Sequence, residues 1–349
     1  MPLGDFPTPV QRLKNLEREL RTDTAIWIKR DDLSDELYGG NKVSKPEFTF
    51  GDAMSRGKRS VVTTGGIGSN HALATAIYGS HLGFKVLLPL FDQSLTAHVR
   101  ENLLLDYFFS AELVYGGGYV NTALKGFKKM WEWRRRDGYF PYFIPPGASN
   151  EIGTVGFVNA MFELKEQIDR DELPRPDLIF VTLGSCGTMA GLLLGSYLSG
   201  LNIKIIGVRV VDRIVSNGWV MRKKALKTWK YLRTFDPNIP LPDESNLINF
   251  EIIHDFFGGE YGRYIPEGMK LREILLRTEG IMLDGTYTSK TFAGLVDYIS
   301  KNRVENVLFW HTYNNRRKFD DILQKVDWHD LPEEFHKFFD GTVPLTFDF

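Results

Sequence analysis

The chain has 349 residues, of which 43% are hydrophobic and 25% charged, and this composition excludes a largely disordered protein. Lysine plus arginine number 43 against 44 for aspartate plus glutamate, so the net charge of −1 lacks the basic excess of a nucleic-acid binder. The single cysteine, Cys186, excludes an internal disulfide framework and a multi-cysteine metal site.

The length is typical of a two-domain protein, at roughly 100–200 residues per domain. The first residues lack the basic start and apolar stretch of a signal peptide, and no apolar run is long enough to span a bilayer. We therefore expect a cytoplasmic enzyme that acts on a small molecule, with no metal site and with neither nucleic acid nor membrane as a partner.

Short runs rich in β-branched residues alternate with amphipathic segments along the chain. The segment 151–168 shows the helical pattern, since its apolar residues recur every three or four positions. Strands that alternate with helices predict an α/β fold with parallel-rich sheets, whose ligands bind in loops at the carboxyl ends of strands. The predicted strands are 26–28, 60–64, 85–90, 112–115, 142–144, 178–183, 204–210 and 306–310.

The first loop of interest is a Gly39-Gly40-Asn41 turn that ends at Lys42, with Lys45 one helical turn further on. Lysine amines become nucleophiles when their pKa is lowered, and they form Schiff bases with aldehydes. An ordinary surface lysine is the alternative for either residue taken alone.

The second loop, Gly65-Gly66-Ile67-Gly68-Ser69-Asn70-His71, follows the strand 60–64 and opens a predicted helix over 72–82. It fails the dinucleotide pattern G-x-G-x-x-G, because His71 stands where glycine or alanine is needed. A helix N-terminus with a hydroxyl, an amide and an imidazole beside it suits a carboxylate or another anion. The alternative is that Ser69 caps the helix and that His71 is a surface histidine with its hydrogen bonds satisfied.

The third loop, 183–191, contains Gly184-Ser185-Cys186-Gly187-Thr188 and links the strand 178–183 to an apolar helix. Its glycines let backbone N–H groups converge on a phosphate, and the helix dipole adds positive potential. It lacks the Lys-Ser/Thr pair of a nucleoside-triphosphate loop, and a tight strand–helix turn without a ligand is an equal alternative. A Schiff-base lysine together with a phosphate loop is the minimal set for pyridoxal phosphate.

Two further segments carry less specific signals. Between 219 and 251, lysines and arginines precede a proline-rich stretch, which predicts a solvated helix followed by a surface loop, with a lid or partner surface as the alternative. After about residue 324 the tail is aromatic and acidic, with Phe347 and Phe349 near its end, and such tails normally pack on something.

Together the three loops resemble those of pyridoxal-phosphate enzymes with the tryptophan-synthase-β fold (fold type II). More narrowly, the chain resembles the family of 1-aminocyclopropane-1-carboxylate deaminase and D-cysteine desulfhydrase over about residues 6–312. Each matching piece is unspecific alone, whereas the ordered set is specific. Besides the three loops, the matching pieces are Phe6-Pro7-Thr8-Pro9-Val10, Lys29-Arg30-Asp31-Asp32, Ile144-Pro145-Pro146-Gly147-Ala148-Ser149, Gly156-Phe157, Glu260-Tyr261-Gly262, Arg277-Thr278-Glu279-Gly280 and Asp284-Gly285-Thr286-Tyr287-Thr288-Ser289-Lys290.

The resemblance implies which residues hold the cofactor. Lys42 would be the cofactor lysine, with Lys45 a close neighbour. Asn70 would contact the phenolic oxygen of the cofactor. The loop residues 184–188 would hold its phosphate.

The resemblance also implies which residues meet the substrate. Ser69, with the N–H groups of its loop, would receive the substrate carboxylate and relay protons, next to Asn70 and His71. Tyr261 and Tyr287 would line the substrate side.

Thr288 occupies a position that separates the branches of this family. The deaminases resemble one another in having a glutamate there, against the pyridine nitrogen, and a carboxylate keeps that nitrogen protonated and the ring a strong electron sink. A hydroxyl favours a neutral nitrogen, which suffices for expelling a good leaving group such as thiolate. His311-Thr312 also resembles the desulfhydrase branch, so opening an unactivated cyclopropane is the less favoured reaction.

Three departures from the family pattern stand out. Gly68 replaces a glutamine in the serine loop, and Asp284-Gly285-Thr286-Tyr287 replaces Asp-Pro-Val-Tyr. The family's His-Thr-Gly-Gly becomes His311-Thr312-Tyr313-Asn314, so a phenol and an amide replace two small residues beside the cofactor ring. This change predicts a reshaped pocket, a different substrate or lost activity.

We expect residues 1–47 plus 158–325 to form a larger cofactor domain, 48–157 a smaller inserted α/β domain, and 326–349 a tail without an assigned role, in a chain that acts as a homodimer. The leading hypothesis is a pyridoxal-phosphate-dependent β-elimination and deamination of a small amino acid, nominally D-cysteine to pyruvate, sulfide and ammonia. Lys42 would take the Cα proton as general base.

The alternative within the class is a 1-aminocyclopropane-1-carboxylate deaminase. A cofactor-binding paralogue without turnover is motivated by Tyr313 and Asn314. A nicotinamide-dependent oxidoreductase is motivated only by the glycine-rich turns, and the failed dinucleotide spacing argues against it.

Overall fold

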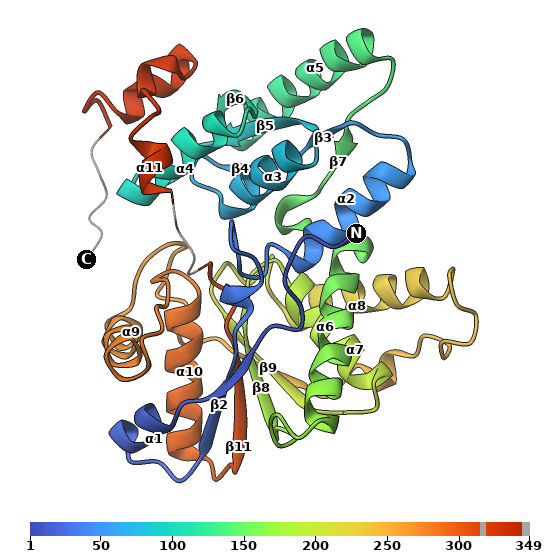
Figure 1. Ribbon diagram of the computed structural model, residues 1–349, viewed down its shortest axis with the longest axis vertical. Coiled ribbons are helices and arrows are strands. Elements are labelled where there is room, and N and C mark those ends of the chain that lie inside the picture. The colour runs from blue at the N-terminus through green and yellow to red at the C-terminus, as the bar shows by residue number, and fades with distance from the viewer. Residues whose placement is uncertain (315–318, 344–349) are drawn as a thin grey trace. The chain divides into compact units, whose positions relative to one another are not determined.

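The computed structural model describes residues 1–314 and 319–343 (Figure 1). The chain divides into a large unit, Pro2–Phe48 with Ser149–Arg316, and a small unit, Met1 with Thr49–Ala148 and Arg317–Phe349. Residues 149–157, expected in the inserted domain, lie in the large unit, because helix α6 (Glu151–Asp169) runs through them and packs on α7 (Gly187–Leu198). Residues 319–325, expected in the larger domain, lie in the small unit.

The large unit is built on a six-stranded sheet with the strand order β1-β2-β11-β8-β9-β10. β1 pairs with β2 antiparallel, and the other neighbours pair parallel. This arrangement confirms the predicted α/β class with parallel-rich sheets. The strands are β1 (Val10–Arg12), β2 (Ala25–Lys29), β8 (Leu178–Leu183), β9 (Lys204–Arg209), β10 (Phe250–Ile253) and β11 (Asn306–Trp310).

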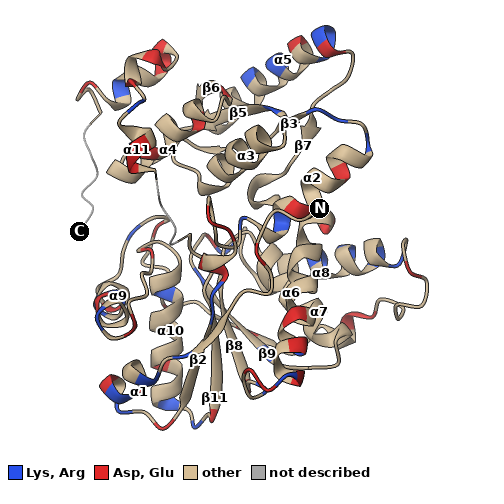
Figure 2. Cartoon of the chain, viewed as in Figure 1, with Lys and Arg blue, Asp and Glu red and all other residues tan. Residues whose placement is uncertain are grey.

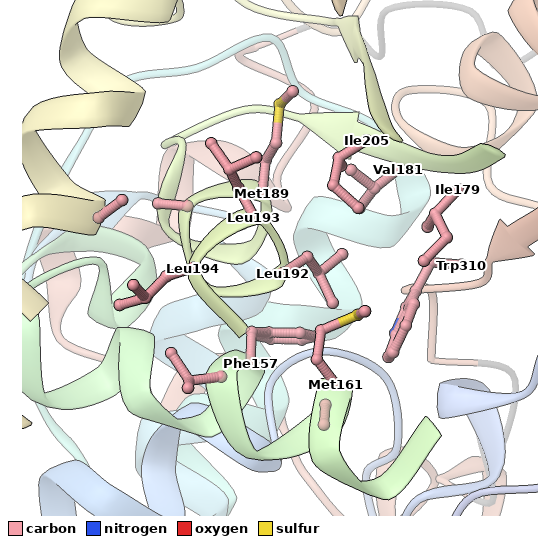
Figure 3. Packing of buried hydrophobic residues seen from close by; sticks show 14 of the residues in the cluster. Phe157, Met161, Ile179, Val181, Met189, Leu192, Leu193, Leu194, Ile205 and Trp310 are labelled. Carbon is pink, nitrogen blue, oxygen red and sulfur yellow. The ribbon is translucent and has the colours of Figure 1, made fainter. Parts of the chain in front are cut away.

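Two hydrophobic cores lie against the two faces of this sheet, since alternate residues of a strand point to opposite sides. Ile179 joins the core formed with α6, α7 and α8 (Gly218–Leu232), and Phe180 joins the core formed with α1 (Lys14–Leu20), α9 (Pro266–Glu279) and α10 (Thr288–Lys301). Figure 3 shows Leu192 of α7 pointing toward Phe157 of α6 in the first core. A Cβ on Gly191 would lie 2.5 Å from the Cβ of Phe157, so this glycine permits the close approach of the two helices.

The small unit contains a five-stranded sheet in which all pairs are parallel. Each predicted strand of the chain is present to within two residues at either end, whereas β1, β4 and β10 were not predicted. The elements of the small unit are β3 (Ser60–Val62), β4 (Gly65–Gly66), α3 (Asn70–His81), β5 (Lys85–Phe91), α4 (Ala97–Phe108), β6 (Glu112–Gly117), α5 (Tyr119–Asp137) and β7 (Tyr142–Phe143).

The end of the described chain belongs to the small unit. It contains α11 (Asp320–Leu323) and the short 3-10 helices η4 (Trp328–Asp330) and η5 (Glu333–Phe338). Phe335 and Phe338 are buried, so the aromatic tail packs on its own chain. The predicted tail residues Phe347 and Phe349 lie outside the described residues.

The basic segment forms α8 and a following loop, as predicted, but the end of the segment also holds the short 3-10 helix η3 (Glu244–Asn246) and the start of β10. Figure 2 shows basic positions recurring along α8 and no acidic position within it. One lysine departs from the expected solvated face, because Lys224 Nζ donates a hydrogen bond to the carbonyl of Ser149 at 2.5 Å. Among residues 1–314 and 319–343, no helix combines the length and the apolar character needed to cross a membrane.

Candidate active site

Lys42 lies in the large unit, two residues before α2 (Ser44–Ser55) begins. Its Nζ donates to Oδ1 of Asn41, and Nδ2 of Asn41 lies 3.5 Å from Oγ1 of Thr188. Burial lowers the pKa of Lys42 to about 8, against the opposing effect of the Asp284 carboxylate. A larger fraction of this amine is therefore neutral near pH 7 than of an ordinary lysine.

The glycine loop turns sharply between the end of β8 at Leu183 and the start of α7 at Gly187. Cys186 adopts a left-handed conformation with φ of 67°, and its thiol lies 3.5 Å from the carbonyl oxygen of Val215. Its backbone rather than its thiol is therefore available to a ligand of the loop. A Cβ on Gly187 would lie 2.5 Å from Oγ of Ser149 and 3.1 Å from Nζ of Lys45, so glycine is required there.

Ser149 connects two lysines to this loop. Lys45 Nζ donates to Ser149 Oγ at 3.2 Å, and Ser149 Oγ lies 2.7 Å from Ser185 Oγ. Burial lowers the pKa of Lys45 well below its usual value, and the positive charges of Lys42 and Lys224 lower it further. An anion beside these amines would favour their protonated forms, and the N-terminus of α7 adds positive potential, so these residues fit the phosphate of pyridoxal phosphate.

Two tyrosines lie at the other side of the loop. A Cβ on Gly184 would be 3.9 Å from Cε1 of Tyr287, and the hydroxyl of Tyr287 contacts that of Tyr261. The two rings meet edge to face with their centroids 6.1 Å apart. Burial raises the pKa of Tyr287 well above its usual value, and Tyr261 adds to the shift. Tyr287 is therefore a protonated phenol, able to donate a hydrogen bond, at physiological pH.

Asp284 organises the start of α10. Its Oδ2 accepts from the N–H groups of Thr286 and Tyr287, and its Oδ1 accepts from both the N–H and the hydroxyl of Thr288, at 2.9 Å and 2.6 Å. The hydroxyl of Thr288 thus donates to Asp284 Oδ1 and also accepts from the Asp284 N–H at 2.9 Å, so its proton and one oxygen lone pair are used within this turn. The carboxylate of Asp284 also raises the pKa of Lys42.

Three of these residues were not predicted to act in the site: Ser149, Lys224 and Asp284. Asp284 bonds the backbone two and three residues further on, and an aspartate followed by glycine is a turn signal that the sequence offered. Ser149 and Lys224 reach the loop from distant parts of the sequence, and the local pattern of neither residue indicates it.

The serine loop lies in the small unit, where Ser69 and Asn70 open α3. Ser69 Oγ accepts from the N–H of Ala72 at 3.3 Å, so Ser69 is the N-cap residue. The alternative of a surface histidine is wrong, because His71 is buried and its Nε2 lies 3.0 Å from Oγ1 of Thr63. An imidazole packed in this way is poorly placed to contact a substrate.

Gln93, in the loop before α4, covers the serine loop. Its Oε1 accepts from the N–H of Gly68 at 3.2 Å, and a Cβ on Gly66 would lie 2.1 Å from that oxygen. A Cβ on Gly68 would lie 2.5 Å from Cγ2 of Val99. The glycine that replaces the family's glutamine is thus required by the close approach of α4.

Comparison with known proteins places the chain in a family. The chain matches the family model for pyridoxal-phosphate dependent enzymes over residues 1–312. A solved structure of a homologue of 1-aminocyclopropane-1-carboxylate (ACC) deaminase superposes with a TM-score of 0.74 at 33% identity, covering 92% of this chain and 94% of the other. The chain belongs to the pyridoxal-phosphate dependent enzymes, which confirms the predicted cofactor, the fold type and the enzyme class.

Two relatives represent the two branches of the resemblance. A protein of Pyrococcus abyssi, provisionally named 1-aminocyclopropane-1-carboxylate deaminase, is 34% identical over 309 residues, which are 88% of this chain and 89% of the relative. The D-cysteine desulfhydrase of Serratia proteamaculans is 30% identical over 312 residues, which are 87% of this chain and 90% of the relative.

Proposed function

We propose that the protein eliminates the β-substituent of a small amino acid and releases the remainder as a 2-oxo acid and ammonia. The nominal substrate is D-cysteine, which with one water gives pyruvate, hydrogen sulfide and ammonia. The observation that supports this proposal most is the lysine with a lowered pKa, Lys42, beside the anion cradle of Lys45, Ser149 and the glycine loop.

The cradle would hold the phosphate of the cofactor. The N–H groups at the start of α7 and the side chains of Ser185 and Thr188 would donate hydrogen bonds to it, and Lys45 and Lys224 would balance its charge. Lys42 would bond through Nζ to the aldehyde carbon of the cofactor. Asn70 would donate to the phenolic oxygen through Nδ2, since its Oδ1 accepts from His98 and Asn102 within the small unit.

Bound pyridoxal phosphate supplies an electron sink for the bonds of the substrate Cα. Released from the aldehyde, Lys42 would accept the Cα proton at Nζ, which needs a neutral amine, and its pKa of about 8 provides one in an appreciable fraction. Tyr287, held protonated by burial and by Tyr261, would orient the substrate by donating from its hydroxyl. Ser69 and the N–H groups of its loop would bind the substrate carboxylate.

Thr288 supports elimination of a good leaving group. A hydroxyl at this position places no charge against the ring, unlike the glutamate of the deaminases that the sequence resembles. Expulsion of thiolate needs a weaker electron sink than opening of a carbon–carbon bond, so D-cysteine is preferred on this ground.

Deamination of ACC is the second candidate function, because the Pyrococcus abyssi relative carries that provisional name at the higher identity. ACC has four carbons, so with one water it would give a four-carbon 2-oxo acid and ammonia. We further propose a cytoplasmic location, since the buried thiol of Cys186 is free. From the family resemblance we also propose that the chain forms a homodimer. Light scattering on the purified protein tests the assembly.

The decisive experiment incubates the purified protein with pyridoxal phosphate and then with D-cysteine, L-cysteine or ACC. Sulfide with pyruvate from D-cysteine supports the leading proposal, and a four-carbon 2-oxo acid from ACC supports the second. Lys42→Ala should abolish both the visible absorbance of the bound cofactor and turnover, whereas Lys14→Ala, on the exposed face of α1, should change neither. A cofactor band without any product would instead favour a non-catalytic paralogue.

A further inference from the structure

Helix α4 and the loop before it hold the serine loop through polar contacts. Asn102 Nδ2 donates to the carbonyl of Gly68 at 2.8 Å and to Oδ1 of Asn70 at 3.2 Å. Nε2 of His98 lies 3.0 Å from the same oxygen of Asn70, and because a carbonyl oxygen only accepts, His98 donates this hydrogen bond. The orientation of the Asn70 amide is therefore set by two residues one turn apart on α4.

Residues 319–343, the C-terminal segment, contact the same helix. Arg100 Nε donates to the carbonyl of Phe338 at 2.6 Å, and the guanidinium lies 5.9 Å from the ring centroid of Phe339. Arg100 stands between His98 and Asn102 in the sequence, so the segment holds α4 at the turn that orients Asn70.

The C-terminal segment also contacts β6 and, through it, the loop that carries Gln93. The ring of Tyr115 packs edge to face with Phe335 and Phe338, at centroid distances of 5.6 Å and 5.7 Å. Its hydroxyl accepts from Lys337 Nζ at 2.7 Å and donates to Oδ1 of Asp92 at 2.5 Å. Asp92 precedes Gln93, whose Oε1 accepts from Gly68 N–H, so this chain of contacts also ends at the serine loop.

We propose that residues 319–343 act as an intramolecular brace that positions Asn70 and the serine loop, with Arg100 as its principal positioning residue. The segment lies beyond the family match, which ends at residue 312, so the brace is an addition to the shared part of the fold. The proposal rests on the proposed function in one respect, which is the role of Asn70 toward the cofactor.

The contacts that would be lost without residues 319–343 explain how the segment could position the serine loop. Without the segment, the rings of Phe335 and Phe338 no longer cover Tyr115, and Arg100 loses its carbonyl acceptor. The first turn of α4 would then keep its cap at Thr96, whose Oγ1 accepts from Val99 N–H at 3.3 Å, and the buried side chain of Val99, but it would lose the anchor that Arg100 provides. Helix ends fray when such tertiary contacts are lost, and His98 lies in that first turn.

The test compares three arginine variants in the full chain. Arg100→Met keeps the packing of the side-chain stem and removes the donor, and Arg100→Lys restores a donor. Arg135→Met removes an exposed arginine of α5 as the matched control. For each variant we would measure the Kd for pyridoxal phosphate, the hydrogen exchange of residues 66–73 in the cofactor-free protein, the thermal midpoint and the kcat and KM of the active substrate.

We expect Arg100→Met to raise the Kd for pyridoxal phosphate about tenfold and to speed exchange in residues 66–73, because small displacements of a positioned group are costly. Arg100→Lys should recover most of both effects, and Arg135→Met should match the wild type.

Unchanged exchange and unchanged cofactor affinity in Arg100→Met would overturn the brace, even if thermal stability fell. Faster exchange throughout the small unit, without recovery in Arg100→Lys, would also overturn it, because the effect would then be one of general stability. Failure of the wild type to bind pyridoxal phosphate would instead refute the proposed function, and the exchange data would still decide whether the segment orders the loop.

Discussion

The side-chain oxygen of Asn314 accepts a hydrogen bond from the backbone N–H of Gly39 at 3.1 Å. Gly39 belongs to the turn that leads to Lys42, and the next residue, Gly40, has a φ of 83°. A Cβ on Gly40 would lie 2.7 Å from the carbonyl oxygen of Thr312. One of the two residues that replace the family's glycines is therefore packed on the lysine turn, where it holds the turn in place.

Replacing Asn314 with glycine tests this contact. We expect Asn314→Gly to lower the free energy of unfolding by about 1–2 kcal/mol, since a buried hydrogen bond is lost and the unfolded chain gains freedom. The Kd for pyridoxal phosphate should rise as the turn loosens. Chemical denaturation and a cofactor titration measure the two effects, and Asn314→Asp, which keeps the accepting oxygen, is the matched control. Tighter cofactor binding in Asn314→Gly would show that the amide obstructs the site.

The pH dependence of cofactor attachment reports on Lys42. The pKa of about 8 means that the amine is mostly protonated below this pH and becomes a competent nucleophile above it. The rate of cofactor attachment to the cofactor-free protein should therefore rise with pH around a midpoint of about 8, in place of about 10.4 for an unperturbed lysine. Stopped-flow absorbance measures this rate. Because the Asp284 carboxylate raises the pKa of Lys42, Asp284→Asn should move the midpoint to lower pH, and a move to higher pH would contradict the assignment.

The close contacts of Gly187 predict a severe effect of a single methyl group. In Gly187→Ala the added Cβ would displace Ser149 Oγ and Lys45 Nζ from the loop. We expect the affinity for pyridoxal phosphate to fall about 10- to 100-fold, because the phosphate would lose positioned donors. Gly118→Ala, where the added Cβ has no neighbour within 4 Å, should bind the cofactor normally. Equal cofactor affinity in the two variants would argue against the loop as the phosphate site.

Inorganic phosphate should bind to the cofactor-free protein with uptake of protons. Burial lowers the pKa of Lys45, and a dianion beside its Nζ would raise that pKa again, so Lys45 would bind a proton as phosphate binds. Calorimetry in buffers with different heats of ionisation measures the uptake, and phosphate affinity should fall as pH rises. Lys45→Met should remove the uptake and weaken binding about 10- to 100-fold, while Lys14→Met should not. An uptake that persists in Lys45→Met would assign it to another group.

The sequence predicted those parts of the fold that depend on local pattern. Buried parallel strands such as Leu178–Leu183 are continuous apolar runs, and α6 keeps its helical periodicity throughout. β10 escaped prediction because all its residues are half-buried at a sheet edge, where the hydrophobic pattern is weak. β4 consists of two glycines that continue β3, and glycine carries no strand preference.

The residues of the candidate site also fall into those that a local pattern marks and those that it does not. Lys42 and the glycine loop could be found from the sequence because turn residues mark them locally. Ser149, Lys224 and Asn314 could not, since each acts through a contact with a segment far away in the sequence. The alternative that placed His71 at the surface failed for a related reason, because the burial of one face of a helical turn depends on the tertiary fold.

The strand order of the large sheet has a consequence for the order of events during synthesis. β11 is the last strand of this sheet to emerge from the ribosome, yet it lies between β2 and β8 in the middle of the sheet. Until Trp310 has been translated, β2 and β8 each present an open edge and the apolar residues around them lack their cover. The strands of the small sheet, by contrast, all lie between Ser60 and Phe143, so the nascent chain can assemble that sheet first. The central strand of the large sheet is therefore added last. Until then, the edges of β2 and β8 are unpaired, and the growing chain needs protection from aggregation through them.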